Sequence, residues 1–304
     1  MEQNATLTKD KKGVINVSTF SQKIHSYLKH PFSLLVWIIT ILAALLTVAS
    51  FVYLVLYILI KGVPYLRPEL FSWTYDSNNV SMLPSIINTF LLTALSLVIS
   101  VPLGIFAAIY MVEYAKKGNR MVKFIRVTAE TLSGIPSIVY GLFGMIFFVG
   151  VLKMQLSLLS GSLTVAIMVL PTIMRTTEEA LLSVPQSYRE GSFGLGAGKL
   201  RTVFRIVLPS AVPGILSGVI LATGRIVGET AALIYTAGTM AKVPNNLFAS
   251  ARTLSVHMYL LSNEGLHTNE AFATAVVLLV FVMLINMLAN FVARRLSAKN
   301  AEND

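Results

Sequence analysis

The chain has 304 residues, of which 55% are hydrophobic and only 12% are charged, and its mean hydropathy is +0.72. A water-soluble domain rarely has this composition, so a soluble enzyme or binding module is disfavoured. The formal net charge of +10 does not indicate a nucleic-acid-binding protein, because the basic residues fall in alternate loops and no such motif accompanies them. The chain contains no cysteine, which excludes disulfides and thiolate metal sites.

Six apolar segments follow a polar and basic stretch, residues 1–30, which we predict to be a flexible cytoplasmic tail. The first segment has 27 consecutive uncharged residues. As a helix it would be about 40 Å long and would cross a hydrocarbon core of about 30 Å with some tilt. Backbone groups in lipid must bond one another, and no segment alternates like a barrel strand, so the sequence predicts an all-α integral membrane protein with six transmembrane helices. The predicted spans are residues 34–60, 84–111, 128–151, 156–174, 213–237 and 271–292.

The basic residues predict the orientation of these spans. The N-terminal stretch, the loops after the second and fourth spans and the C-terminal stretch hold 18 of the 24 Lys and Arg, whereas the other loops hold five. The positive-inside rule therefore predicts that both termini, and the long loop after the fourth span, lie in the cytoplasm. We expect a membrane domain over residues 31–295 and a cytoplasmic tail over residues 296–304. A short interfacial helix is expected in the longest external segment, near residues 254–261.

Two features of the third and fourth spans each allow two interpretations. The third span contains Gly134 and Pro136, which interrupt helical hydrogen bonding. Interrupted helices often mark transport sites, although an ordinary kink would use the same residues. Arg175, at the cytoplasmic end of the fourth span, either anchors that span as a positive-inside residue or contacts an anionic substrate.

The cytoplasmic loop over residues 176–209 is polar and contains several glycines. Its pattern consists of Glu190, Gly191, Gly196, Leu208 and Pro209. The run from Gly194 to Lys199 looks like a nucleotide-binding loop, but Phe193 stands where the first glycine should be and Leu200 where the hydroxyl should be. We therefore reject ATP binding by this chain and interpret the glycines as bending points of a helix–turn–helix lever.

The fifth span carries Arg225, the thirteenth of its 25 residues, close to the predicted bilayer midplane. Leaving it unpaired would cost about 2.5–3.5 kcal/mol on insertion scales, so it must face something other than lipid. Glu229 follows four residues later on the same predicted helix face, and Thr230 adds a hydroxyl. The pair is either a buried salt bridge that fixes packing or a station for a small anion. We favour the station, because a planar guanidinium suits phosphate-like oxyanions.

Three segments together resemble the permeases of phosphate-specific (Pst) ABC importers: residues 133–144, the cytoplasmic loop, and residues 224–233. The resemblance extends over residues 83–295. The loop is similar to the EAA loop of ABC importer permeases, with Glu-Gly-Ser in place of Glu-Ala-Ala from Glu190 onward and Leu-Pro at the expected spacing. The short first external segment and the Ser-Gly-Ile-Pro sequence resemble the PstA type of subunit more than the PstC type. Where the family usually has Ala-Pro after Gly-Glu-Thr, this chain has Ala231-Ala232, so the resemblance does not carry a kink over to this point.

The resemblance implies a MetI-like, type I permease fold in the bacterial cytoplasmic membrane. It implies that the anion near Arg225 is inorganic phosphate and that partner ATPases act on the loop around Glu190. The implied partners are a PstC-like sister permease, two copies of an ABC ATPase and an extracytoplasmic phosphate-binding protein. The chain itself would be a non-catalytic subunit that binds no cofactor, since the ATPases use the ATP and magnesium.

Alternatives stay open for the substrate and for the class of transporter. A permease for another oxyanion, such as sulfate or molybdate, would have the same fold, but the segment around Arg225 favours phosphate. A stand-alone secondary anion transporter would need no ATPase, and the EAA-like loop disfavours it. An intramembrane enzyme is disfavoured because the spans contain no His-Glu-x-x-His, Ser–His or paired-aspartate arrangement. Phosphate keeps a proton near neutral pH and can donate a hydrogen bond to Glu229, whereas sulfate has no proton and would be repelled.

Overall fold

The structure is a computed structural model that describes residues 31–116 and 118–301. The predicted N-terminal tail, residues 1–30, and the end of the predicted C-terminal tail, residues 302–304, lie outside the described residues. Within the described ranges all regular structure is helical. The chain divides into two compact units, Met1–Tyr57 and Ile58–Asp304.

The described part of the first unit is a single helix, α2 (Pro31–Gly62), whose last residues belong to the second unit. Its large apolar side chains, among them Leu42, Leu46 and Phe51, are exposed. The helix is long and apolar enough to cross a membrane, and it extends the predicted first span at both ends. Because it is apolar on all sides, it requires lipid or another protein around it.

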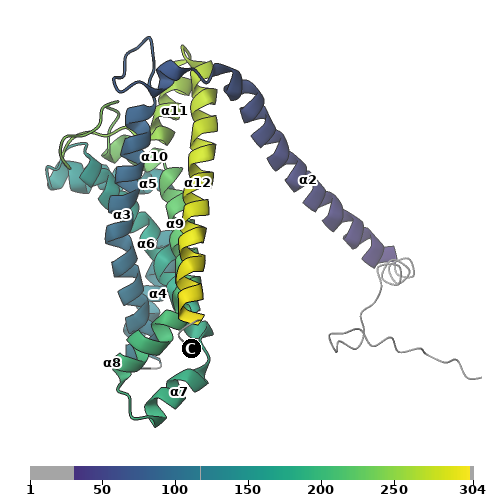
Figure 1. The fold of residues 1–304 in the computed structure, drawn as a ribbon, viewed down its shortest axis with the longest axis vertical. Coiled ribbons are helices and arrows are strands. Elements are labelled where there is room, and N and C mark those ends of the chain that lie inside the picture. The colour runs from purple at the N-terminus through teal and green to yellow at the C-terminus, as the bar shows by residue number, and fades with distance from the viewer. Residues whose placement is uncertain (1–30, 117, 302–304) are drawn as a thin grey trace, which may run out of the picture. The chain divides into compact units, whose positions relative to one another are not determined.

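In the second unit, four long helices lie side by side (Figure 1): α3 (Leu83–Ile109), α6 (Leu158–Ser183), α9 (Leu208–Val227) and α12 (Thr268–Ala301). Each belongs to a helical stretch that is long and apolar enough to span a membrane. They correspond to the second, fourth, fifth and sixth predicted spans. Figure 1 also shows α7 and α8 at one end of this unit and α11 at the other end.

Glycines allow these helices to approach one another closely. A Cβ atom at Gly104 of α3 would lie 2.8 Å from the Cγ2 of Ile173 on α6. One at Gly214 of α9 would lie 2.6 Å from the Cβ of Ala180, also on α6. Lipid supplies no hydrophobic force between helices, so close van der Waals packing of this kind holds α3, α6 and α9 together.

The third predicted span, residues 128–151, is not one helix. It consists of α4 (Arg120–Ser133) and α5 (Ser137–Gly144), which continues as a π-helical turn, η4 (Met145–Val151). The chain bends by 104° between α4 and the arm formed by α5 and η4. Pro136 has an extended backbone with φ −59° and ψ 143°, and its ring removes an amide donor, so α4 cannot continue through this residue.

The fifth predicted span, residues 213–237, is also interrupted. α9 ends at Val227, residues 228–230 are not helical, and α10 (Ala231–Thr236) follows. Thr230 has φ −124° and ψ −54°, which lies away from helical values. The span is therefore interrupted although no proline follows Thr230. Hydrogen bonds of Glu229 to Ala232 and Ser255 lie at the break.

The helix predicted in the longest external segment is present, and it packs against the rest of the unit. The end of the second unit opposite α7 and α8 consists of two 3₁₀ turns, η1 (Val63–Tyr65) and η2 (Pro68–Phe71), and of α11 (Leu254–Glu264). Leu254 and Leu261 of α11 are almost completely buried in a cluster shared with η2, α3 and α12. One face of the helix thus belongs to the protein core, and its place at the membrane surface stays a prediction.

The helix α11 also buries an imidazole. His257 is 0% exposed, its Nδ1 lies 3.4 Å from an Nη1 of Arg252, and its ring packs edge-on against Tyr75. Burial lowers the pKa of His257 to about 4, the charge of Arg252 acts in the same direction, and the backbone of Val80 opposes them. The folded chain therefore keeps this imidazole neutral at pH values where a free histidine is protonated.

We expect His257 to make the fold sensitive to acid between pH 6.5 and about 4. In that window the unfolded chain binds a proton that the folded chain excludes, so stability falls as the pH falls, by up to about 3 kcal/mol. The temperature of thermal inactivation, measured across this pH range, should drop in the wild type and drop much less in His257→Gln. His267→Gln, at a partly exposed histidine, is the matched control. Equal pH dependence in His257→Gln and the wild type would contradict the prediction.

Candidate functional site

Arg225 lies in the last turn of α9 and is partly buried. Among the described residues it forms no ion pair with Glu229. The two do not share a helix face, because α9 ends at Val227 and Glu229 lies in the non-helical residues that follow. Ile226, the residue after Arg225, packs in a buried cluster with Tyr140 of α5. The place of Arg225 in the last helical turn is favourable for a cation, because the carbonyl end of a helix dipole is negative.

Glu229 holds the interrupted segment in place. It is 8% exposed, and its Oε1 accepts a hydrogen bond of 3.0 Å from the Ala232 amide at the start of α10. Its backbone carbonyl accepts a 2.6 Å hydrogen bond from the Ser255 hydroxyl of α11. A carboxylate that satisfies a free amide at a helix start stabilises that start. These two contacts explain why a new helix begins after Thr230 without a proline.

The two interrupted helices lie against each other. A Cβ atom at Gly141 of α5 would lie 2.8 Å from the Cα of Ala232 in α10, so only glycine permits this approach. The Tyr140 hydroxyl donates a 2.7 Å hydrogen bond to the Leu132 carbonyl in α4, across the break at residues 134–136. This bond is added to the one that the Leu132 carbonyl already accepts from the Ile135 amide, so it ties α5 to the end of α4. The structure thus has two breaks, one predicted at Gly134 and Pro136 and one found at residues 228–230. Contact between α5 and α10 links them.

A groove of about 590 Å³ runs between α4 and α6 and reaches Leu221 of α9, one helical turn before Arg225. Five charged side chains line it: Arg126, Glu130, Arg175, Glu178 and Glu179. Arg126 pairs with Glu178, and the Nε of Arg175 donates a 3.2 Å hydrogen bond to Glu179.

Arg175 lies within α6, because this helix continues past the predicted end at residue 174 to Ser183. The first residues of the predicted loop therefore belong to this helix. The Arg175 and Glu179 side chains are 66% and 65% exposed, and an ion pair so exposed is worth little. Arg175 can therefore exchange Glu179 for another anion at small cost.

The cytoplasmic loop predicted at residues 176–209 folds into a helical hairpin. α7 (Gln186–Gly194) and α8 (Lys199–Thr202) are followed by a π-helical turn, η5 (Val203–Val207), which runs directly into α9. Gly196 forms the turn with φ +82°, a conformation that glycine adopts without strain. Glu190 and Gly191 are exposed on α7. Leu208 and Pro209 are the first residues of α9, directly after the π-helical turn η5.

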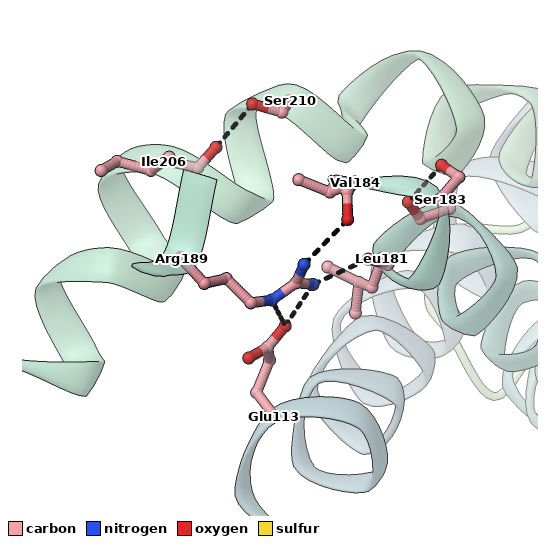
Figure 2. Close-up of polar contacts among 8 residues, drawn as sticks. Glu113, Leu181, Ser183, Val184, Arg189, Ile206 and Ser210 are labelled. Carbon is pink, nitrogen blue, oxygen red and sulfur yellow. Dashed lines mark hydrogen bonds and ion pairs between the residues drawn. The ribbon is translucent and has the colours of Figure 1, made fainter. Parts of the chain in front are cut away.

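Arg189 fixes this hairpin (Figure 2). It is one of the basic residues of the predicted loop, and the sequence gives no sign that it is buried. The Nε and Nη2 of Arg189 donate to Glu113 Oε1 at 3.1 Å and 2.7 Å. Its Nη1 donates to the Val184 carbonyl and its Nη2 to the Leu181 carbonyl, both at 2.9 Å. Glu113 lies in η3 (Tyr110–Tyr114), a π-helical turn that ends α3. Nothing in the local sequence pairs residues 76 positions apart, although Glu113 is an acidic residue next to a strongly basic loop.

The hairpin exposes several large apolar side chains: Tyr188, Phe193, Leu195, Leu200 and Phe204. Leu195, at the tip, is 91% exposed. An exposed apolar patch rimmed by polar residues is typical of a surface that binds another protein.

Interrupted helices beside a partly buried arginine, together with a helical hairpin at one end of the bundle, are typical of the membrane subunit of a transporter. The comparison with protein families is more specific. Residues 100–301 match the family described as the binding-protein-dependent transport system inner membrane component. The chain belongs to this family and is a multi-pass protein of the cytoplasmic membrane, as predicted.

Several relatives share much of this chain. The probable ABC transporter permease protein YqgI of Bacillus subtilis (strain 168) is 34% identical over 282 residues, which cover 86% of this chain and 95% of the relative. The phosphate transport system permease protein PstA 1 of Mycobacterium tuberculosis (strain ATCC 25618 / H37Rv) is 35% identical over 204 residues, which cover 65% of this chain and 66% of the relative. The predicted resemblance to Pst permeases of the PstA type is confirmed.

Solved structures share the fold. A chain of the MetNI methionine ABC transporter in an inward-facing conformation has a TM-score of 0.56 at 21% identity, covering 71% of this chain and 94% of that chain. A chain of a bacterial alginate ABC transporter has a TM-score of 0.66 at 16% identity, covering 89% and 98%. The predicted all-α, MetI-like permease fold is confirmed.

Proposed function

We propose that this chain is the membrane-spanning permease subunit of an ATP-driven importer of inorganic phosphate. The observation that carries the proposal is the meeting of two interrupted helices, through α5 and α10, against the last turn of α9, which carries the partly buried Arg225. Relatives named as PstA phosphate permeases support phosphate as the substrate. Sulfate and molybdate, the other oxyanions that such a site could accept, are tested by the experiment below.

The chemistry of the site suits a partly protonated oxyanion. The guanidinium of Arg225 offers two parallel donors to two anion oxygens. Thr230, five residues after Arg225 in the chain, is half-buried and carries a hydroxyl. One oxygen of Glu229 accepts a hydrogen bond from the Ala232 amide. The other oxygen can accept a hydrogen bond from the protonated oxygen that phosphate still carries near neutral pH. The groove that contains Arg175 would then connect this site with the cytoplasm.

The proposal includes partners that supply the energy and the substrate. They are a PstC-like sister permease, two copies of an ABC ATPase and an extracytoplasmic phosphate-binding protein. The exposed apolar patch on the hairpin and the exposed Glu190 support docking of the ATPase there. This chain would be non-catalytic and bind no cofactor, and the ATPases would use the ATP and magnesium.

The test is transport by the reconstituted complex in lipid vesicles. Labelled phosphate should enter only when ATP is present on the ATPase side, and excess sulfate or molybdate should compete weakly. Uptake that follows an ion gradient without ATP would indicate a secondary transporter. Strong competition by sulfate or molybdate would indicate a permease for another oxyanion.

Glu229 is predicted to select phosphate over sulfate. Glu229→Gln removes the carboxylate that accepts a hydrogen bond from phosphate and repels sulfate. A hydrogen bond to a charged group contributes about 1.5–3 kcal/mol, so the preference for phosphate should fall by about 10- to 100-fold. Competition of sulfate against phosphate uptake measures this change. Glu179→Gln, at an exposed carboxylate in the groove, is the control, and an unchanged preference in Glu229→Gln would show that Glu229 only holds α10.

A further inference from the structure

The Arg189–Glu113 pair differs from an ordinary surface ion pair. Only 10% of the Arg189 side chain and 9% of the Glu113 side chain are exposed, compared with 66% and 65% for Arg175 and Glu179. An exposed pair can separate at little cost, whereas a buried charge that loses its partner is strongly unfavourable. The buried pair should therefore stay closed while the elements that carry it move.

Arg189 also supplies hydrogen bonds that the backbone cannot make. In a continuing helix the Leu181 carbonyl would accept from the amide of residue 185, but residue 185 is proline and has no amide hydrogen. The Nη2 of Arg189 donates to this carbonyl at 2.9 Å, and Nη1 donates to the Val184 carbonyl. The guanidinium thus caps the end of α6 and pairs with the end of α3 at the same time, as Figure 2 shows.

The other end of the hairpin is connected to α9. The hydroxyls of Ser192 in α7 and Thr202 in α8 lie 2.8 Å apart and are buried, and the Ala197 amide donates to the Ser192 carbonyl. These contacts hold α7 and α8 together. Since α8 and η5 run directly into α9, the hairpin is attached to α9 by continuous helix and to α3 and α6 by the Arg189 side chain.

We propose that Arg189 is the positioning residue that makes a force on α7 reach α3 and α6 as well as α9. The inference rests on the proposed function, in which an ATPase pushes on this hairpin. With Arg189 bound to Glu113 and to the end of α6, the hairpin and the cytoplasmic ends of α3, α6 and α9 move as one body. Without it, a push on α7 reaches α6 directly only through the extended link at Val184 and Pro185, and otherwise indirectly, through α8, η5 and the packing of α9 against α6.

The experiment compares transport with ATP use in the reconstituted complex of this chain, its sister permease, the ATPases and the binding protein. The quantity measured is phosphate moved per ATP hydrolysed, with co-purification of the ATPase as the measure of assembly. In Arg189→Ala this ratio should fall about tenfold, within the range of roughly 5- to 150-fold that coupling between sites spans, while assembly and ATP hydrolysis persist. Arg189→Lys keeps the charge and some donors, and should recover part of the ratio.

Glu113→Gln and Arg120→Ala complete the design. Glu113→Gln keeps an acceptor oxygen but removes the charge, and the ratio of phosphate moved to ATP hydrolysed should fall in this variant too. It serves as the test if Arg189→Ala fails to assemble. Arg120→Ala changes an exposed arginine in the first turn of α4 and should leave the ratio unchanged. An unchanged ratio in Arg189→Ala would overturn the inference. A parallel loss of assembly, ATP hydrolysis and uptake in Arg189→Ala, Arg189→Lys and Glu113→Gln would overturn it as well. A wild-type complex without ATP-driven uptake would overturn the proposed function instead.

Discussion

Replacing Arg225 with alanine should abolish phosphate uptake while the complex still assembles. Arg225 is the only Lys or Arg between Arg205 and Lys242, so no neighbour in this part of the chain can replace its charge. Two charge-assisted hydrogen bonds, at about 1.5–3 kcal/mol each, correspond to a loss of at least about 100-fold. Uptake of labelled phosphate into vesicles measures the loss, and co-purification of the partner subunits measures assembly.

Arg225→Lys is the matched variant for that experiment. It keeps the positive charge at the end of α9 but replaces the planar fork with a single ammonium, so uptake should be weak and not absent. If the charge served only the helix dipole of α9, lysine would restore uptake fully. Normal uptake in Arg225→Ala would show that the residue is needed neither for binding nor for translocation.

Gly141→Ala should have the second large effect, although it adds a single methyl group. The new Cβ would lie 2.8 Å from the Cα of Ala232, which is backbone and cannot rotate away. We expect α10 to be displaced, together with the Glu229 carboxylate that binds its first turn, at a cost of about 1–3 kcal/mol. Both the temperature of thermal inactivation and phosphate uptake should fall.

Gly150→Ala is the control for this substitution. Gly150 lies in the same arm of the bent span, but the nearest atom to its new Cβ would be the Met145 carbonyl oxygen at 3.5 Å, an ordinary contact. It should behave like the wild type. If Gly141→Ala did so too, α5 and α10 would not be in contact in the working transporter.

The sequence predicted those parts of the fold that depend on composition over a long window. The spans that became α2, α3 and α12 are long runs of apolar residues, and such runs form helices in lipid whatever their neighbours are. The end of α6 was placed too early, because charged residues such as Arg175 end an apolar window without ending a helix. Arginine and glutamate are good helix formers, so α6 continues to Ser183.

The site could be predicted only where a single residue carries the signal. Arg225 is conspicuous because a charge inside an apolar span is costly. The interruption after α9 has no local sign: it depends on Ser255, 26 residues away, and on the space left by Gly141. The same is true of Arg189, whose partner Glu113 comes from a different span. Contacts between distant segments decide these features, and residue periodicity does not record them.

The continuous helical stretch from Lys199 to Val227 has a consequence for how affinity can change during transport. At about 1.5 Å per residue its 29 residues form a rod of about 40 Å, with the hairpin at one end and Arg225 near the other. A tilt of about 10° around its middle would displace Arg225 by about 3 Å, which is the full length of a hydrogen bond. A bound anion would then lose its guanidinium partner by rigid-body geometry alone, with no side-chain rearrangement inside the site.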